Sequence, residues 1–224
     1  MTDVHDGPHP GPALADPAVS VRLNAALAAG TRPDPANVEM LVRRCAVEPD
    51  FYVRDMLTWA LTRHDAAVTV DLLLAELGSE VAQGRSQALH TLSKIGDPRA
   101  WPAISTALLQ DADDEVARTA WRTAAGLVPE GAESGLAATL ATQFGRGGRE
   151  LQRSLSRAFA VLGEAAEPAV ARAATASDPD VRAHAVATER VMADPDEAFD
   201  GAMDEARRIV ALRGAPLGEG ATMC

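Results

Sequence analysis

The chain has 224 residues and a net charge of −11, from 32 acidic and 21 basic side chains. Hydrophobic residues make up 47% and aromatic residues only 4%. Ala, Leu, Arg and Glu recur throughout and alternating β-branched runs are missing, so the composition predicts an all-α fold. The acidic balance disfavours binding to a phosphate backbone, although a local basic patch stays compatible with it.

The two ends of the chain differ in composition from its middle. Residues 1–16 are rich in Pro, Gly, Asp and His and predict a disordered arm, and residues 213–224 predict a flexible tail. The N-terminus has no basic stretch followed by an apolar one, and no apolar run approaches the ~20 residues of a membrane span. Cys45 and Cys224 are isolated thiols without metal spacing, so we expect a cytoplasmic protein.

A repeat of about 32 residues runs through the middle of the chain. Similar helical segments recur at spacings of 32, 31, 32, 35 and 30 residues, measured at one anchor position in each. The anchor residues are Arg22, Arg54, Arg85, Ala117, Gln152 and Arg182. The predicted repeats lie near residues 17–48, 49–79, 80–111, 112–145, 146–177 and 178–212 of one repeat domain, 17–212.

Aspartates keep the same phase as the anchors. One set lies four residues before an anchor and another, followed by Pro, lies twelve residues after it. The sets are Asp50, Asp113 and Asp178, and Asp34, Asp97 and Asp194. Because Asp is a good helix N-cap and Pro suits the first helical turn, each repeat is predicted to contain a helix A, a tight turn and a helix B.

Apolar residues of the predicted B helices share one register. They recur with the i, i+3, i+7 spacing of a buried helical stripe. The sets are Val38, Leu41 and Cys45; Val70, Leu73 and Leu77; and Trp101, Ile104 and Leu108. Since one helix pair cannot bury both of its faces, neighbouring pairs are predicted to stack into an α-solenoid.

The stretch RSQALHTLSKIGDPRAWPAISTALLQDADDEVARTA, residues 85–120, resembles HEAT repeats of the bacterial, phycobilisome-lyase-like type. The resemblance extends over roughly residues 16–212. It implies a right-handed α-solenoid of about six helix pairs that serves as a protein-binding scaffold, as most such arrays do. It also leaves two enzymatic alternatives open, a DNA glycosylase of the HEAT-like type and a bilin-lyase-like protein.

No catalytic constellation accompanies the repeat. Asp97 is explained as a helix cap, and the acidic residues 111–115 as a helix N-terminus. His64, His90 and His184 fall in three different repeats, and the chain has no His-Glu pair of the iron-dependent HEAT-like hydroxylases. We therefore predict no metal, no cofactor and no enzymatic activity.

Two further features have alternative interpretations. Trp59, Trp101 and Trp121 fall on apolar stripes, which predicts core packing rather than the aromatic groove of a glycosylase. The sequence GRGGRE, residues 145–150, lacks the Lys and Ser/Thr of a phosphate loop, so it is predicted to lengthen a turn or to act as a hinge.

The predicted function is a non-catalytic scaffold that binds a protein or peptide partner on the concave face formed by the B helices. Residues on the solvent side of those helices would contact the partner, and the acidic composition favours a basic one. The candidate contact residues are Glu39, Arg43, Asp71, Arg99 and Thr106.

Overall fold

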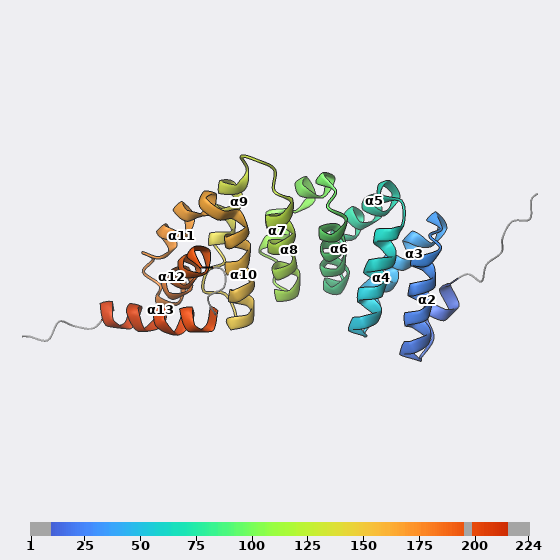
Figure 1. The fold of residues 1–224 in the computed structure, drawn as a ribbon, viewed down its shortest axis with the longest axis horizontal. Coiled ribbons are helices and arrows are strands. Elements are labelled where there is room, and N and C mark those ends of the chain that lie inside the picture. Colours follow the sequence, from blue (N-terminus) through green and yellow to red (C-terminus); the bar gives the residue numbers. More distant parts are fainter. Residues whose placement is uncertain (1–9, 195–198, 215–224) are drawn as a thin grey trace, which may run out of the picture. The chain divides into compact units, whose positions relative to one another are not determined.

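The computed structural model describes residues 10–194 and 199–214 (Figure 1). These residues form α-helices and short 3₁₀-helices and no β-strand. The fold is an all-α solenoid of paired helices, as predicted. It divides into two compact units, Met1–Val128 and Pro129–Cys224, and the division falls inside the predicted fourth repeat.

The first unit stacks its A helices side by side, with the B elements against them (Figure 1). After a short helix α1 (Gly11–Leu14), the A helices are α2 (Val19–Thr31), α4 (Phe51–Arg63), α6 (Ala82–Ile95) and α8 (Asp114–Leu127). The B elements are η1 (Pro35–Asn37) with α3 (Val38–Val47), α5 (Ala66–Glu76), and η2 (Pro98–Ala103) with α7 (Thr106–Leu109).

The second unit continues the pattern. Helix α12 packs against both α10 and α13, and α9 and α11 pack together through η3. Its elements are α9 (Glu133–Ala141), α10 (Arg149–Leu162), η3 (Gly163–Ala166), α11 (Glu167–Ala173), α12 (Pro179–Ala193) and α13 (Phe199–Gly214).

The aspartates before the anchors cap the A helices, as predicted. Asp50 accepts hydrogen bonds from the amides of Tyr52 and Val53 at 2.9 and 3.1 Å. Asp113 and Asp178 make the same two bonds at the starts of α8 and α12. Each cap satisfies amides that have no partner within the helix.

The Asp-Pro pairs cap shorter elements than predicted. Asp34 and Asp97 accept the amides of Ala36 and Arg99, but each begins a 3₁₀-helix rather than an α-helix. In the third repeat Pro102 also prevents one continuous helix B, because it has no amide to donate. The helix start predicted at Asp194 falls outside the described residues.

Five of the six anchor residues, all but Ala117, tie their A helix to the turn before it. Arg22, Arg54 and Arg182 each donate through Nη1 to the carbonyls five and six residues earlier. Arg85 donates to the carbonyl six residues earlier, and Gln152 replaces arginine by donating to two carbonyls of the 145–147 turn. This contact explains why the repeat is clearest at the anchors.

Hydroxyl groups join successive A helices inside the stack. Ser86 on α6 lies 3.2 Å from Thr119 on α8, and Ser156 on α10 lies 2.7 Å from Thr188 on α12. All four side chains are buried. Buried polar groups are costly unless hydrogen-bonded, so these pairs help to fix the register between neighbouring repeats.

The three tryptophans differ in burial. Trp121 is fully buried and donates its indole N–H to the Leu109 carbonyl at 2.7 Å, as predicted for a core residue. Trp101 is only half-buried. Trp59 is 38% exposed and lies over Gly30 of α2, so its predicted place in the core is wrong. The indole packs so closely on Gly30 that a Cβ atom there would lie 2.3 Å from the ring.

The predicted terminal segments and hinge have partial counterparts in the described residues. The predicted N-terminal arm contains helix α1, whose Leu14 is buried against the first unit, so ordered structure begins earlier than expected. Residues 1–9 and 215–224 lie outside the described residues. The turn at residues 145–148 carries Gly145 and Gly147 at positive φ, which glycine adopts without strain. A hinge there stays a prediction.

Candidate functional site

The predicted contact residues form two separate groups of paired charges. Glu39 and Arg43, one turn apart on α3, make an ion pair of 3.0 Å, and both are well exposed. Arg99 Nη1 lies 2.9 Å from Asp71 on α5, so the fold brings together two of the predicted residues from neighbouring repeats. Thr106 is exposed at the start of α7.

Arg99 is neutralised twice. Besides Asp71, it contacts Asp97 at 2.9 Å, and the hydrogen bonds from Arg99 hold the pKa of the Asp97 carboxyl below its ordinary value. Charges that compensate each other within one chain attract a partner weakly. The role of these five residues in partner binding stays a prediction.

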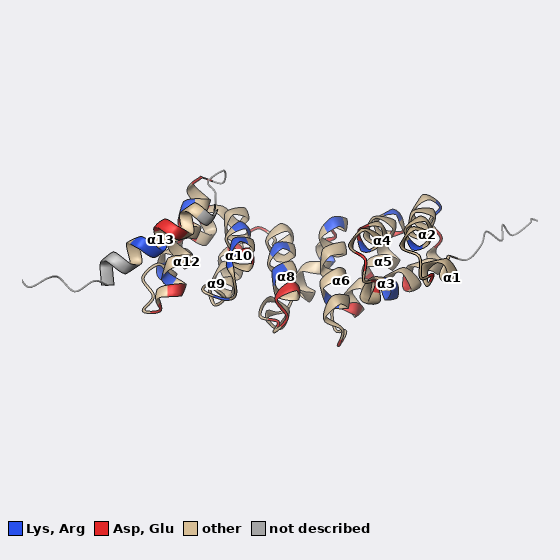
Figure 2. Ribbon diagram, turned by 90° about the horizontal axis from the view of Figure 1, so that it is seen from below, with Lys and Arg blue, Asp and Glu red and all other residues tan. Residues whose placement is uncertain are grey.

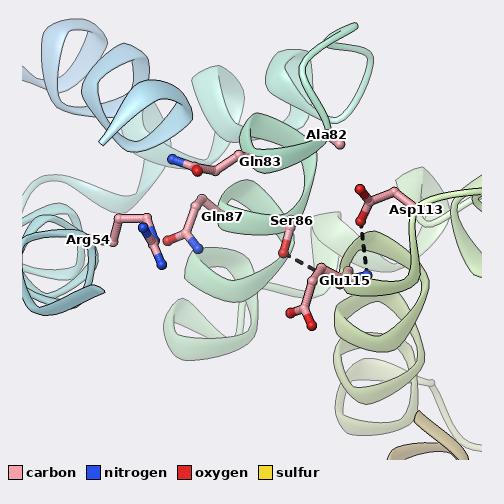
Figure 3. A pocket seen from close by; sticks show the side chains of 7 residues that line it. All are labelled: Arg54, Ala82, Gln83, Ser86, Gln87, Asp113 and Glu115. Carbon is pink, nitrogen blue, oxygen red and sulfur yellow. Dashed lines mark hydrogen bonds between the residues drawn. The ribbon is translucent and has the colours of Figure 1, made fainter. Parts of the chain in front are cut away.

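A groove of about 200 Å³ opens on the other side of the first unit, near the N-terminal ends of its A helices. Figure 3 shows Arg54 of α4 on one side, Gln87 of α6 between, and Asp113 and Glu115 on the other side. The groove therefore has a cation on one side and two carboxylates on the other, with the Gln87 amide between them. Its complete lining is Arg54, Ala82, Gln83, Ser86, Gln87, Asp113 and Glu115.

Much of the groove lining is fixed by internal bonds. Arg54 donates through Nη1 to the carbonyls of Glu48 and Pro49, and Gln83 donates to those of Cys45 and Glu48 at 2.9 Å. These contacts hold side chains of two neighbouring A helices against one turn. The groove is thus a rigid feature, a property that lowers the entropy cost of binding.

An exposed apolar ridge lies beside this groove, at the end of α3, the start of α4 and the N-cap of α6. We call Val47, Phe51, Tyr52 and Val81 the ridge; they are 62%, 64%, 72% and 47% exposed. The Phe51 and Tyr52 rings form an edge-to-face pair with centroids 5.6 Å apart. The sequence patterns did not single out this ridge. The two aromatic residues directly after the Asp50 cap could have indicated it, since side chains in the first turn of a capped helix are often exposed.

A buried carboxylate supports the turn beneath the ridge. Glu48 is 0% exposed and accepts hydrogen bonds from Arg22 at 2.9 Å, from Arg44, and from the Asp50 amide at 2.9 Å. Burial would raise the pKa of Glu48, but the hydrogen bonds from Arg22, the Asp50 amide and Arg44 lower it to about 2. Glu48 is therefore ionised at neutral pH and holds the turn in place.

A second, more open groove of about 390 Å³ lies on the B side of the first unit. It is lined mainly by apolar side chains around the Arg85–Asp111 ion pair of 2.9 Å. Its lining is Leu74, Leu77, Gly78, Arg85, Ala103, Ser105, Ala107, Leu108 and Asp111.

Metal sites and membrane-spanning helices are both absent from the described residues. Within residues 10–194 and 199–214, no group of three or more His, Cys, Asp and Glu side chains is placed to hold a metal ion. In the same residues no helix is both long and apolar enough to cross a membrane. The histidines lie apart, and His64 and His184 are buried among helices.

The family comparison covers the part of the chain that carries the ridge and the first groove. Residues 46–126 match the family model for HEAT repeats. These residues are HEAT repeats. The match spans α4 to α8, so the groove of Figure 3 lies wholly within it. No curated protein matches the chain.

Two solved structures align with most of the chain at low identity. The crystal structure of an engineered protein aligns with a TM-score of 0.46 and 15% identity, over 84% of this chain and 98% of that one. Human deoxyhypusine hydroxylase in complex with glycerol aligns with a TM-score of 0.44 and 17% identity, over 90% and 93%.

Proposed function

We propose that the protein is a non-catalytic adaptor whose HEAT repeats bind a protein partner, and that the ridge and the adjoining groove form the docking surface. The observation that carries this proposal is the exposed Phe51–Tyr52 pair. Aromatic residues are enriched at protein interfaces and dominate their binding energy, whereas a surface without a partner gains nothing from exposing two aromatic rings.

The groove complements the ridge. It offers an arginine, two carboxylates and an amide beside an apolar surface, which suits a protein segment better than a nucleic acid. The glycosylase alternative calls for a basic groove, yet two carboxylates line this groove. We place the protein in the cytoplasm as part of this proposal, since Cys45 is a buried free thiol.

To test the proposal, the proteins that co-purify with the wild-type chain are compared with those that co-purify with matched variants. Phe51→Ala/Tyr52→Ala should lose the partner that the wild-type chain retains from native lysate, because it removes the apolar anchor. Val161→Ala, at another strongly exposed apolar position, is the control and should retain it. Both substitutions are at exposed sites, so the unfolding free energy should change by less than about 1 kcal/mol.

A third variant distinguishes the ridge from the predicted B-helix strip. Glu39→Ala/Arg43→Ala removes an exposed ion pair of α3 and leaves the ridge intact. If this variant loses the partner and Phe51→Ala/Tyr52→Ala keeps it, the docking surface is the B-helix face. If every variant retains only what an unrelated bait retains, the adaptor function is wrong.

A further inference from the structure

Four basic side chains gather on neighbouring A helices of this acidic protein. His90 and Lys94 lie on α6, and Arg118 and Arg122 lie on α8; we call them the basic cluster. Arg122 Nη2 is 3.2 Å from His90 Nδ1. Figure 2 shows acidic positions at one end of α8 and basic positions further along it.

The architecture of the helices accounts for only part of this cluster. Lys94 lies in the last turn of α6, where the helix dipole favours a cation, and Arg118 pairs with Glu115 at 2.6 Å. Arg122 lies in mid-helix, and within the described residues its side chain meets His90 and no carboxylate at ion-pair distance. Because like charges repel, this grouping of cations is electrostatically unfavourable. The chain has 32 acidic side chains, and one of them beside Arg122 would neutralise its charge.

Burial and the neighbouring positive charges lower the pKa values of His90 and Arg122. Partial burial lowers the pKa of His90, the positive charges of Arg122 and Lys94 lower it further, and Asp55 of α4 opposes them. Burial and the charge of Arg118 lower the pKa of Arg122, with Glu115 opposing. An anion bound here would relieve both repulsions.

The free polar atoms of the cluster are hydrogen-bond donors. Arg122 donates to Nδ1 of His90, which leaves the proton of the neutral imidazole on Nε2. The ammonium of Lys94 and the guanidinium of Arg122 can only donate. The chemistry that matches such a set is an oxyanion with several acceptor lone pairs.

The cluster continues the lining of the groove along one face of α6. Gln83, Gln87, His90 and Lys94 follow one another at intervals of four, three and four residues. At ~1.5 Å per residue this strip is ~16 Å long, the span of about five residues of extended chain. A segment lying in the groove can therefore reach the cluster.

We propose that the basic cluster binds the carboxylates of an acidic stretch in the same partner segment that docks on the ridge and groove. This inference rests on the proposed adaptor function and specifies its partner as an apolar segment followed by Asp or Glu residues. Bound carboxylates favour the charged form of His90, so the acidic stretch should bind more tightly as the pH falls. The groups facing His90 in this linkage are Lys94, Arg122 and Asp55.

The probe is a hexaglutamate peptide, titrated into the purified full-length protein at low salt while the His90 imidazole signal is followed by NMR. The signal is assigned with His90→Gln. We expect a saturable shift and a raised His90 pKa. Lys94→Ala/Arg122→Ala should weaken binding at least tenfold, whereas Arg172→Ala/Arg207→Ala, which removes two exposed cations elsewhere, should change it less than twofold.

Three outcomes would overturn the inference. They are equal binding by the two double variants, no response of His90, or the same shift with inorganic phosphate at equal charge, which would make the cluster a general small-anion site. The adaptor function is judged separately. If Lys94→Ala/Arg122→Ala retains the partner and Phe51→Ala/Tyr52→Ala loses it, the acidic-segment inference fails and the adaptor function stands.

Discussion

Stability of the second unit should fall on mild acidification because of His184. This imidazole is fully buried on α12, where Nδ1 accepts the Gly145 amide at 3.1 Å and Nε2 donates to the Gln152 carbonyl at 2.9 Å. Protonation of Nδ1 would set a second N–H against that of Gly145. Burial lowers the pKa of His184 to about 4, and the hydrogen bond to the Gln152 carbonyl only partly offsets this effect.

The magnitude follows from the two pKa values. Unfolded His184 binds its proton near pH 6.5, whereas folded His184 does so only near pH 4. The unfolded chain therefore holds more protons in this window, and the unfolding free energy falls as the pH falls through it. Each pH unit is worth about 1.4 kcal/mol, so about 2 kcal/mol should be lost between pH 6.5 and pH 5.

Urea unfolding at a series of pH values measures this loss, with His184→Gln as the comparison. The variant starts less stable but lacks the titrating group, so wild-type protein should lose about 2 kcal/mol more than the variant between pH 7.5 and pH 5. An NMR titration of the His184 signal gives an independent value. Equal losses in the two proteins, or a His184 pKa near 6.5, would refute the reasoning.

Three other consequences are open to direct measurement. Gly30→Ala would bring a methyl group within 2.3 Å of the Trp59 ring, so it should destabilise the protein by about 1–3 kcal/mol and change its tryptophan fluorescence. Gly126→Ala, where the added methyl group meets open space, should stabilise α8 by up to about 1 kcal/mol. Equal effects of the two variants in thermal melts would contradict this packing. Glu48→Gln should cost about 3 kcal/mol by urea unfolding, since two arginines lose a buried carboxylate, and an unchanged midpoint would count against that role. Burial raises the pKa of the Cys45 thiol to about 12, so in a Cys224→Ser background it should react with a thiol reagent only after unfolding; rapid labelling of the native protein would show that this thiol is accessible.

The parts of the fold that sequence predicted depend on chemistry repeated in several helix pairs. An aspartate four residues before an anchor caps its own helix, and an arginine anchor ties the turn that precedes it, as Asp50 and Arg54 do. Both contacts join residues close in sequence. The interruption of helix B at Pro102 was equally local, and the repeat pattern obscured it because neighbouring repeats have no proline there.

The supporting ion pairs were harder to find because each joins residues far apart in sequence, near the two ends of one predicted repeat. Arg22 meets Glu48, and Arg85 meets Asp111, each across 26 residues. That common spacing is itself periodic, so it could serve as a signal in other arrays of this kind. This spacing identifies acidic side chains whose charge is neutralised by an arginine of the same chain. Such acids should be set aside before a partner is inferred from charge.

Charge on a folded array informs about partners only after internal pairs are removed. The net charge of −11 predicted a basic partner on the B helices, yet Asp71 and Arg99 there neutralise each other. In the described part of the chain, Lys94 and Arg122 lack a carboxylate at ion-pair distance. Both lie on A helices, which the composition gave no reason to predict as a partner-binding face. The first unit thus carries unpaired positive charge on α6 and α8, along the A-helix layer from the groove and the ridge. A partner should be matched to that combination rather than to the charge of the whole chain.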